Sequence, residues 1–243
     1  MLSSTKGIVI HHFKYSEKSV IAKIYTEKYG LISYIVNGVR NKKSKNKAAY
    51  LQPLSIVEIT ANHKDNKGLQ RINTIELEIP FNSIPFDISK STIAFFLAEI
   101  LYKAIKEEEA NPPLFEFLHK TLQVLDLSAN GYSNFHLIFL INLSKYLGFY
   151  PQNRNLPENI DHYFDLQEGL FTNLLPYHKS FLDPQLSTLF HQTLGTNFDA
   201  METLTINNKQ RKMLLSAILN YYSLHLSNFD NLKTLEILEE ILY

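Results

Sequence analysis

Hydrophobic and polar residues alternate along the first 80 residues in short runs that turn residues separate. Runs of this kind, rich in Val, Ile, Thr and Tyr, are typical of β-strands that bury one face. The predicted strands are Gly7–Phe13, Ser19–Thr26, Leu31–Val36, Leu54–Thr60 and Gln70–Glu78. Five short antiparallel strands suit a small closed barrel such as the five-stranded OB-fold, and an SH3-like barrel also fits.

The periodicity changes from two to about 3.6 residues after the linker Pro80–Phe86. Apolar residues at helical spacing predict helices over residues 89–107, 114–127, 134–147, 183–194, 208–226 and 232–242. We predict Ser89 or Ser91 as the N-cap of the first helix, and Asn111, before two prolines, as the cap of the second. Residues 1–80 are therefore expected to form an OB-fold domain, and residues 81–243 an α-helical domain.

The helical pattern is interrupted over residues 149–176, where Pro151, Pro157 and Gly169 break it. Residues 163–171 predict a small hairpin within this irregular insertion. The preceding helix is apolar nearly all round, which predicts a buried central helix. The expected fold is thus an α+β multidomain protein, with a five-stranded β-barrel followed by an all-α domain that carries a hairpin insertion.

The net charge of zero hides two halves of opposite character. Residues 1–80 hold 13 Lys+Arg against 6 Asp+Glu, so 13 − 6 = +7, and residues 81–243 hold 11 against 18, so 11 − 18 = −7. This asymmetry suggests that the basic domain meets a polyanion, while the acidic half either meets another partner or holds the assembly together. The sequence has no cysteine, no signal-peptide pattern and no apolar run of about 18 residues, so we expect a cytoplasmic protein without disulfides or thiolate zinc sites.

The segment Asn37–Lys47 carries five cations and no carboxylate, which predicts a solvated, mobile basic loop between the third and fourth strands. On composition, such a loop serves either solubility or binding, and the β-like sequence on both sides favours binding because functional loops are usually held by a rigid scaffold. More lysines lie near the first two turns, at Lys14, Lys18, Lys23 and Lys28. Tyrosines lie among them, at Tyr15, Tyr25, Tyr29 and Tyr34, and those on the wet face are suited to stack bases.

An enzyme is the sharpest alternative, and its common motifs would be visible in the sequence. The sequence has no GxxxxGK[ST], GxGxxG, GxSxG or HExxH pattern, which argues against those enzyme classes. His11 and His12 are neighbours on a predicted strand and point to opposite faces, which argues against a shared metal. A metal-dependent hydrolase would have to use the histidines and aspartates of the C-terminal half, Asp161, His162, Asp165, His178, His191 and His225. Nothing in the sequence fixes their spacing, so structural or surface roles are favoured.

A series of motifs in the N-terminal half resembles the bacterial recombination mediator family RecO. The motifs are K-G-I-V at Lys6–Val9, Y-x-E-x-S at Tyr15–Ser19, T-x-x-x-G at Thr26–Gly30, G-x-R at Gly38–Arg40 and L-Q-P-L at Leu51–Leu54. Further similarity lies at Tyr146–Pro151, Phe164–Gly169 and the tail 214–242, so the resemblance spans nearly the whole chain.

The resemblance implies an OB-fold joined to a helical domain, with no bond-breaking catalysis. It implies binding of single- and double-stranded DNA, annealing of complementary strands, association with RecR and in some members with the tail of the single-stranded DNA-binding protein, and help in loading RecA. It also implies a nucleoid-associated bacterial protein of the RecF pathway of DNA-damage repair. Many members hold zinc with four cysteines after the L-G-x-x-P motif. Because this chain has none, we expect no metal or other cofactor, and Phe149–Phe171 is expected to keep its shape by packing.

The predicted DNA-binding residues are the cations of the basic segment and of the barrel turns, namely Arg40, Lys42, Lys43, Lys45, Lys47, Lys14, Lys18 and Lys28. Arg40 matches the family's G-x-R, and the others rest on charge and on their place in the barrel. The family's partner site lies in the helical domain, where Arg211, Lys212 and Leu215 are the candidates. An OB-fold RNA-binding module is the alternative function, because the same charges and tyrosines suit RNA.

Overall fold

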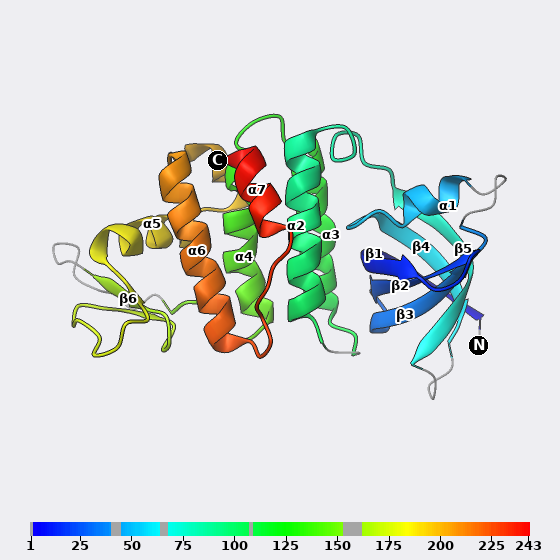
Figure 1. Ribbon diagram of the computed structural model, residues 1–243, viewed down its shortest axis with the longest axis horizontal. Helices are drawn as coiled ribbons and strands as arrows, with labels where there is room; N and C mark the ends of the chain where they lie inside the picture. Colours follow the sequence, from blue (N-terminus) through cyan, green and yellow to red (C-terminus); the bar gives the residue numbers. More distant parts are fainter. Residues whose placement is uncertain (1, 40–44, 64–67, 107–108, 153–161) are drawn as a thin grey trace. The chain divides into compact units, whose positions relative to one another are not determined.

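The structure is a computed structural model that describes residues 2–39, 45–63, 68–106, 109–152 and 162–243. It consists of two compact units, Met1–Leu127 and Ser128–Tyr243 (Figure 1). The predicted domain boundary at residue 80 lies inside the first unit. That residues 1–80 fold as a separate domain stays a prediction.

Five strands close a barrel in the first unit, in the order β1-β2-β3-β5-β4. The strands are β1 (Leu2–Lys14), β2 (Ser19–Thr26), β3 (Gly30–Asn37), β4 (Ile56–Asn62) and β5 (Leu69–Ile79). This confirms the predicted five-stranded OB-fold barrel. Two details differ from expectation. The described pairing of β3 with β5 is parallel, and β1 begins at Leu2 because residues 2–6 pair with β4.

The turn between β2 and β3 gives the T-x-x-x-G motif a physical reason. The Thr26 hydroxyl donates to the carbonyl of Gly30 (2.9 Å) and accepts from the backbone N–H of Tyr29 (3.1 Å). Gly30 has φ +69°, a conformation that glycine adopts without the steric penalty of a side chain. The threonine and the glycine thus fix the turn together.

The L-Q-P-L motif ties the segment after β3 to the barrel. A short helix, α1 (Lys45–Tyr50), precedes it, and Leu51 is buried in the barrel core. Leu54, with φ +63°, donates its N–H to the Val9 carbonyl (2.7 Å). The prediction of a loop over residues 37–47 is therefore wrong from Lys45 onward, where the chain is helical. Residues 40–44 lie outside the described part.

Two helices, α2 (Ile88–Ala104) and α3 (Pro112–Leu127), belong to the same unit as the barrel. The Tyr25 ring on β2 stacks on Phe115 of α3, with ring centroids 6.4 Å apart. Ile8 is also buried, although alternation with interior Val9 places it on the outer face of β1, and Ile10, at the bulge between Val9 and His11, is buried as well. The outer face of the β1–β2 pair is therefore apolar and has to pack against other residues, as Tyr25 packs against Phe115.

The helix caps are partly as predicted. Asn111 caps α3, since its side-chain oxygen accepts from Leu114 N–H (3.1 Å). The predicted cap of α2 at Ser89 or Ser91 is wrong. Asp87 fills this position and accepts from the N–H groups of Ser89 (2.8 Å) and Lys90 (3.1 Å), because α2 begins at Ile88, before both serines.

The Asp126 carboxylate fixes the linker between barrel and helices. It accepts backbone N–H bonds from Asn82 (2.8 Å), Ser83 (2.8 Å) and Ile84 (2.9 Å). Burial alone would raise the pKa of Asp126, but these backbone hydrogen bonds outweigh it and hold the pKa below its ordinary value of 3.8. The linker is thus tied to the end of α3.

The second unit is mainly helical. Its elements are η2 (Tyr132–Asn134), α4 (Phe135–Tyr146), β6 (Tyr163–Asp165), β7 (Leu170–Thr172), β8 (Phe181–Leu182), α5 (Pro184–Leu194), η3 (Phe198–Thr203), α6 (Asn208–His225) and α7 (Leu235–Leu242). Residues of α4 are buried nearly all round, which confirms the predicted central helix. Among the described residues, no helix has both the length and the hydropathy that a membrane span requires.

The predicted hairpin is present as β6 and β7, and β8 extends it to a three-stranded sheet. Its core is an aromatic cluster of Phe164, Phe171, Phe190 and Tyr221, with Phe164 4.5–5.5 Å from the other three rings. Tyr221 also donates its hydroxyl to the Phe149 carbonyl (2.5 Å). The described part of Phe149–Phe171 is thus held by ring packing and hydrogen bonds.

Candidate nucleic-acid interface

The turn between β1 and β2 presents two lysines and a tyrosine to solvent. Lys14 and Lys18 are exposed, and Tyr15 is 58% exposed. The backbone N–H groups of Tyr15 and Ser16 both donate to the Ser19 carbonyl (3.1 Å each), so the turn has a defined conformation. A fixed turn with cations around an exposed ring suits a nucleic-acid backbone and an unpaired base.

The basic segment leaves the barrel at the same edge. Gly38 donates its N–H to the Lys18 carbonyl (2.8 Å), and the Ser19 hydroxyl donates to the Asn37 side chain (2.9 Å). The structure therefore joins the β1–β2 turn to the start of the segment that holds most of the predicted DNA contacts. We call this region, the turn with Asn37 and Gly38, the barrel edge.

The predicted contacts within the basic segment stay predictions. Arg40, Lys42 and Lys43 lie outside the described residues. Lys45 and Lys47 are on α1, of which the structure describes the backbone at these positions.

Lys28 lies apart from the other described lysines of the prediction. It is in the turn after β2, whereas Lys14 and Lys18 flank the turn before it, so the eight residues of β2 separate them by about 26 Å. Lys28 is exposed, and its ammonium donates to the Ser4 carbonyl (2.6 Å). The structure thus brings Lys14 and Lys18 together and places Lys28 at the opposite end of the barrel.

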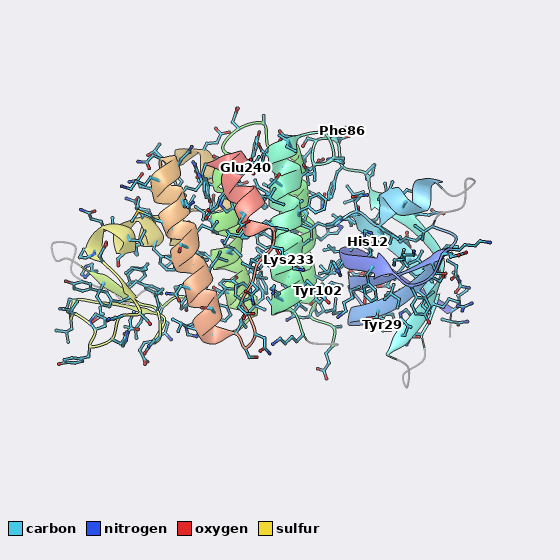
Figure 2. All side chains as sticks on the ribbon, viewed as in Figure 1. His12, Tyr29, Phe86, Tyr102, Lys233 and Glu240 are labelled. Atoms are coloured by element: carbon cyan, nitrogen blue, oxygen red, sulfur yellow. The ribbon has the colours of Figure 1, made fainter. Side chains whose placement is uncertain are left out.

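The four barrel tyrosines divide between core and surface. Tyr25 and Tyr34 are buried, and burial raises the pKa of the Tyr34 phenol, so this group stays neutral. Tyr29, labelled in Figure 2, is partly buried and stacks on His63 with ring centroids 3.8 Å apart. His63 also joins the Tyr34 hydroxyl (2.7 Å), so these rings form one structural group, and Tyr15 is the exposed candidate for stacking.

The candidates for a partner site on α6 have different environments. Arg211 is buried, and its guanidinium donates to the side chains of Asn134 (2.9 Å) and Asn208 (2.7 Å). Leu215 is buried as well. Lys212 is exposed and pairs with Glu239 of α7 (2.6 Å). Of the three, Lys212 is thus the one open to a partner, and the assignment stays a prediction.

Three residues of the hydrolase alternative, Asp165, His178 and His225, have structural partners. Asp165 accepts from the N–H groups of Gln167 (2.9 Å) and Glu168 (3.0 Å), and it pairs with His178 (3.1 Å). His225 bonds the Leu166 carbonyl (2.9 Å). Asp161 lies outside the described residues. Within the described ranges, no group of three or more His, Asp or Glu is placed to hold a metal ion. The Asp165 carboxylate instead shapes the hairpin turn.

Comparison with known proteins agrees with this architecture. The family described as "Recombination protein O N terminal" matches residues 1–81, and "Recombination protein O C terminal" matches residues 85–236. A DNA repair protein RecO from Flavobacterium psychrophilum is 43% identical over 243 residues, which cover 99% of each chain. DNA repair proteins RecO from Bacteroides fragilis and Phocaeicola vulgatus are 40% and 37% identical, again over 99% of each chain.

Both family matches lie in the expected order, and the barrel and helical region correspond to them. The similarity to the bacterial relatives extends over nearly the whole length of each protein. The chain therefore belongs to the RecO family of DNA repair and recombination proteins.

Proposed function

We propose that this protein is a non-enzymatic mediator that binds single- and double-stranded DNA through the barrel edge and anneals complementary strands. The observation that carries the proposal is the exposure of Lys14, Tyr15 and Lys18 where the basic segment leaves the barrel. In the bacterial cytoplasm, at the nucleoid, the protein would act with RecR to load RecA, and it would bind the tail of the single-stranded DNA-binding protein.

The physical basis is sequence-independent electrostatics. Lysines that neutralise phosphates release condensed counterions, so binding depends on salt and not on base sequence. Annealing needs two more conditions: the cations must reduce the repulsion between two strands, and the bases must stay available to pair. An exposed turn with one aromatic ring leaves most bases of a bound strand available to pair, whereas a deep groove would enclose them.

The partner proposals rest on family membership and on surface chemistry. Lys212 is an exposed cation next to Met213, which is also exposed, so this stretch of α6 offers charge and apolar surface together. That combination suits an acidic peptide with apolar side chains.

Salt titrations of DNA binding and annealing test the DNA proposal. We expect the double variant Lys14→Ala/Lys18→Ala, and the variant with Arg40, Lys42, Lys43, Lys45 and Lys47 all changed to Ala, to bind more weakly. The slope of log K against log salt should become shallower by about 0.7–0.9 for each phosphate that the variant no longer neutralises. The matched control Lys179→Ala/Lys209→Ala removes two exposed lysines from the second unit and should leave the slope unchanged.

An unchanged slope in both interface variants would show that the barrel edge is not the contact surface. Competition between DNA and RNA strands of the same sequence addresses the alternative function. Tighter binding of RNA, without annealing of DNA, would favour an RNA-binding module.

A further inference from the structure

Three aromatic rings and an ammonium group meet where β1, β2 and α2 come together in the first unit. The His11 ring lies 4.7 Å from Tyr102 and 6.3 Å from Phe13, measured between ring centroids. The Lys23 ammonium lies 4.9 Å from the centroid of Tyr102, which is labelled in Figure 2. We call Phe13, His11 and Tyr102 the ring row.

The ring row is open to solvent. Phe13 is 43% exposed, Tyr102 is 38% exposed, and His11 is exposed as well. Single exposed aromatic residues are common on protein surfaces, but three neighbouring rings with a cation over one of them form a surface of defined chemistry.

A purely structural role does not require this exposure. Contacts of α3 already connect the helices to the barrel, through the Tyr25–Phe115 stack and the Glu78–His119 bond (2.9 Å). The ring row lies outside these buried contacts. The exposed parts of Phe13 and Tyr102 remain available for a ligand.

The ring row continues the barrel edge along the chain. Phe13 stands two residues before Tyr15, so the ring row and the exposed turn are neighbours at this end of β1. Aromatic faces stack on unpaired bases of any sequence, and lysines beside them neutralise the phosphates. The bases of a duplex are already stacked on one another, so few of them are available to stack on the rings.

We propose that the ring row is a stacking track for single-stranded DNA that extends the interface from Tyr15 to Tyr102. The inference rests on the proposed function. It adds the path of the DNA single strand over the protein, from Tyr15 to Tyr102, and a preference for unpaired bases. Glu99 lies one turn before Tyr102 on α2 and interacts electrostatically with His11. Its negative charge would repel a phosphate group at this position.

Leucine substitutions test the track because they remove a ring and keep an apolar side chain. The full chain and its variants Phe13→Leu and Tyr102→Leu are titrated with fluorescein-labelled oligothymidylate and with a duplex of the same length. We expect each variant to bind the single strand at least about fivefold more weakly, with little change for the duplex. The salt slope should stay unchanged, because no cation is removed.

Two further variants sharpen the comparison. Tyr177→Leu removes a fully exposed ring from the second unit and should bind as the wild type does. Glu99→Gln should tighten single-strand binding, because it removes a negative charge beside the track. Photo-crosslinking of the wild-type protein to an oligonucleotide containing 4-thiothymidine should give adducts at Phe13 or Tyr102, whatever the stability of the variants.

The outcomes separate this inference from the proposed function. Normal binding of both DNA forms by the leucine variants, with crosslinks elsewhere, would overturn the track and leave the barrel edge in place. Equal losses for single strand and duplex would also overturn it. Intact DNA affinity with weakened binding to a protein would assign the rings to that partner instead. A wild-type protein that binds no DNA at all would overturn the proposed function itself.

Discussion

Gly169 occupies the one position of the hairpin turn where both the backbone and a neighbouring side chain require glycine. Its φ is +67°, and a Cβ atom would lie 2.6 Å from the Tyr221 hydroxyl. We expect Gly169→Ala to lower the free energy of unfolding by the roughly 1–2 kcal/mol of the left-handed backbone. Displacement of the Tyr221 hydroxyl from the Phe149 carbonyl should add to that loss. Urea unfolding measures the sum.

Gly148 offers a matched control, because its φ is +87° and nothing lies within 4 Å of its Cβ position. Gly148→Ala should therefore show the backbone effect alone. In a Tyr221→Phe background, the extra loss at Gly169 should shrink. Equal losses for the two alanine variants would show that contact with Tyr221 contributes nothing.

Asp126 gives a prediction about pH. Its pKa is lower in the folded chain than in the unfolded one, so the stabilisation is complete above the ordinary value of 3.8 and is lost as the pH falls through the folded value. Asp126→Asn turns an amide N–H toward backbone donors and should cost about 2 kcal/mol near neutral pH. The difference between wild type and variant should diminish below pH 3.8 in urea titrations. A constant difference across the whole acid range would contradict this account.

Individual side chains were predictable where a local rule applies and not where tertiary packing decides. Strand alternation separated Tyr34 from Ile35, but only the closed barrel shows that Tyr34 faces the core. The cations at Lys14 and Lys18 could be found from charge alone. The position of Tyr102 beside the barrel could not, because it depends on a contact with His11, 91 positions earlier in the chain.

At the scale of elements, one carboxylate links α3 to the barrel, because it bonds a lysine of the barrel and a histidine of the helix. Glu78 on β5 bonds Lys6 of β1 (2.5 Å) and His119 of α3 (2.9 Å). Burial alone would raise the pKa of Glu78, but the hydrogen bonds with Lys6 and His119 outweigh it and hold the pKa below 4.5. The contribution is thus present above pH 4.5 and lost as the pH falls through the folded value.

Glu78→Gln should destabilise the first unit by about 1 kcal/mol, because Lys6 is partly exposed and solvent screens the pair. Amide hydrogen exchange should show the loss mainly in α3 and the adjoining strands. Glu116→Gln on the same helix breaks an exposed pair with Lys120 and serves as the control, with no measurable change expected. Similar exchange in the two variants would argue against a specific link at Glu78.

The long helices followed from the sequence, and the short helix α1 did not. The periodic patterns predicted α2 to α7 within a few residues, because each spans two or more turns. The six residues of α1 are too few for a period to stand out, and their charges indicated a loop. The L-Q-P-L motif marked the position but not the reason, which is the anchoring of Leu51 and Leu54 against β1 and the core.

For the whole molecule, the division at Leu127 leads to a test with fragments. A fragment of residues 1–127 keeps the α2–α3 pair with the barrel and should unfold cooperatively. A fragment of residues 1–80 lacks the helices that belong with the β1–β2 ladder, including Phe115, the partner of Tyr25. We expect the shorter fragment to bind a hydrophobic dye and to aggregate. A monomeric, cooperatively folded 1–80 fragment would instead support a domain boundary at residue 80.

The overall architecture was predictable because the change of period and the family motifs agree on one order of elements. The candidate site was predictable only in part. Charge located the barrel edge, since Lys14 and Lys18 stand next to a turn signal. The separation of Lys28 depends on which end of β2 each turn occupies, and the hydrogen bond of Gly38 to Lys18 depends on the register of β2 and β3, in which Ser19 pairs with Asn37.

The aromatic cluster around Phe164 has a consequence for the conditions under which the fold stays stable. The chain has no cysteine, and the described hairpin is held by rings and by Asp165. Hydrocarbon packing offers nothing for a chelator to remove or for diamide to oxidise. We expect the melting temperature to be the same with and without EDTA or diamide. Scarcity of zinc or a burst of oxidant, which damages DNA as well, should therefore leave this fold intact when repair is needed most.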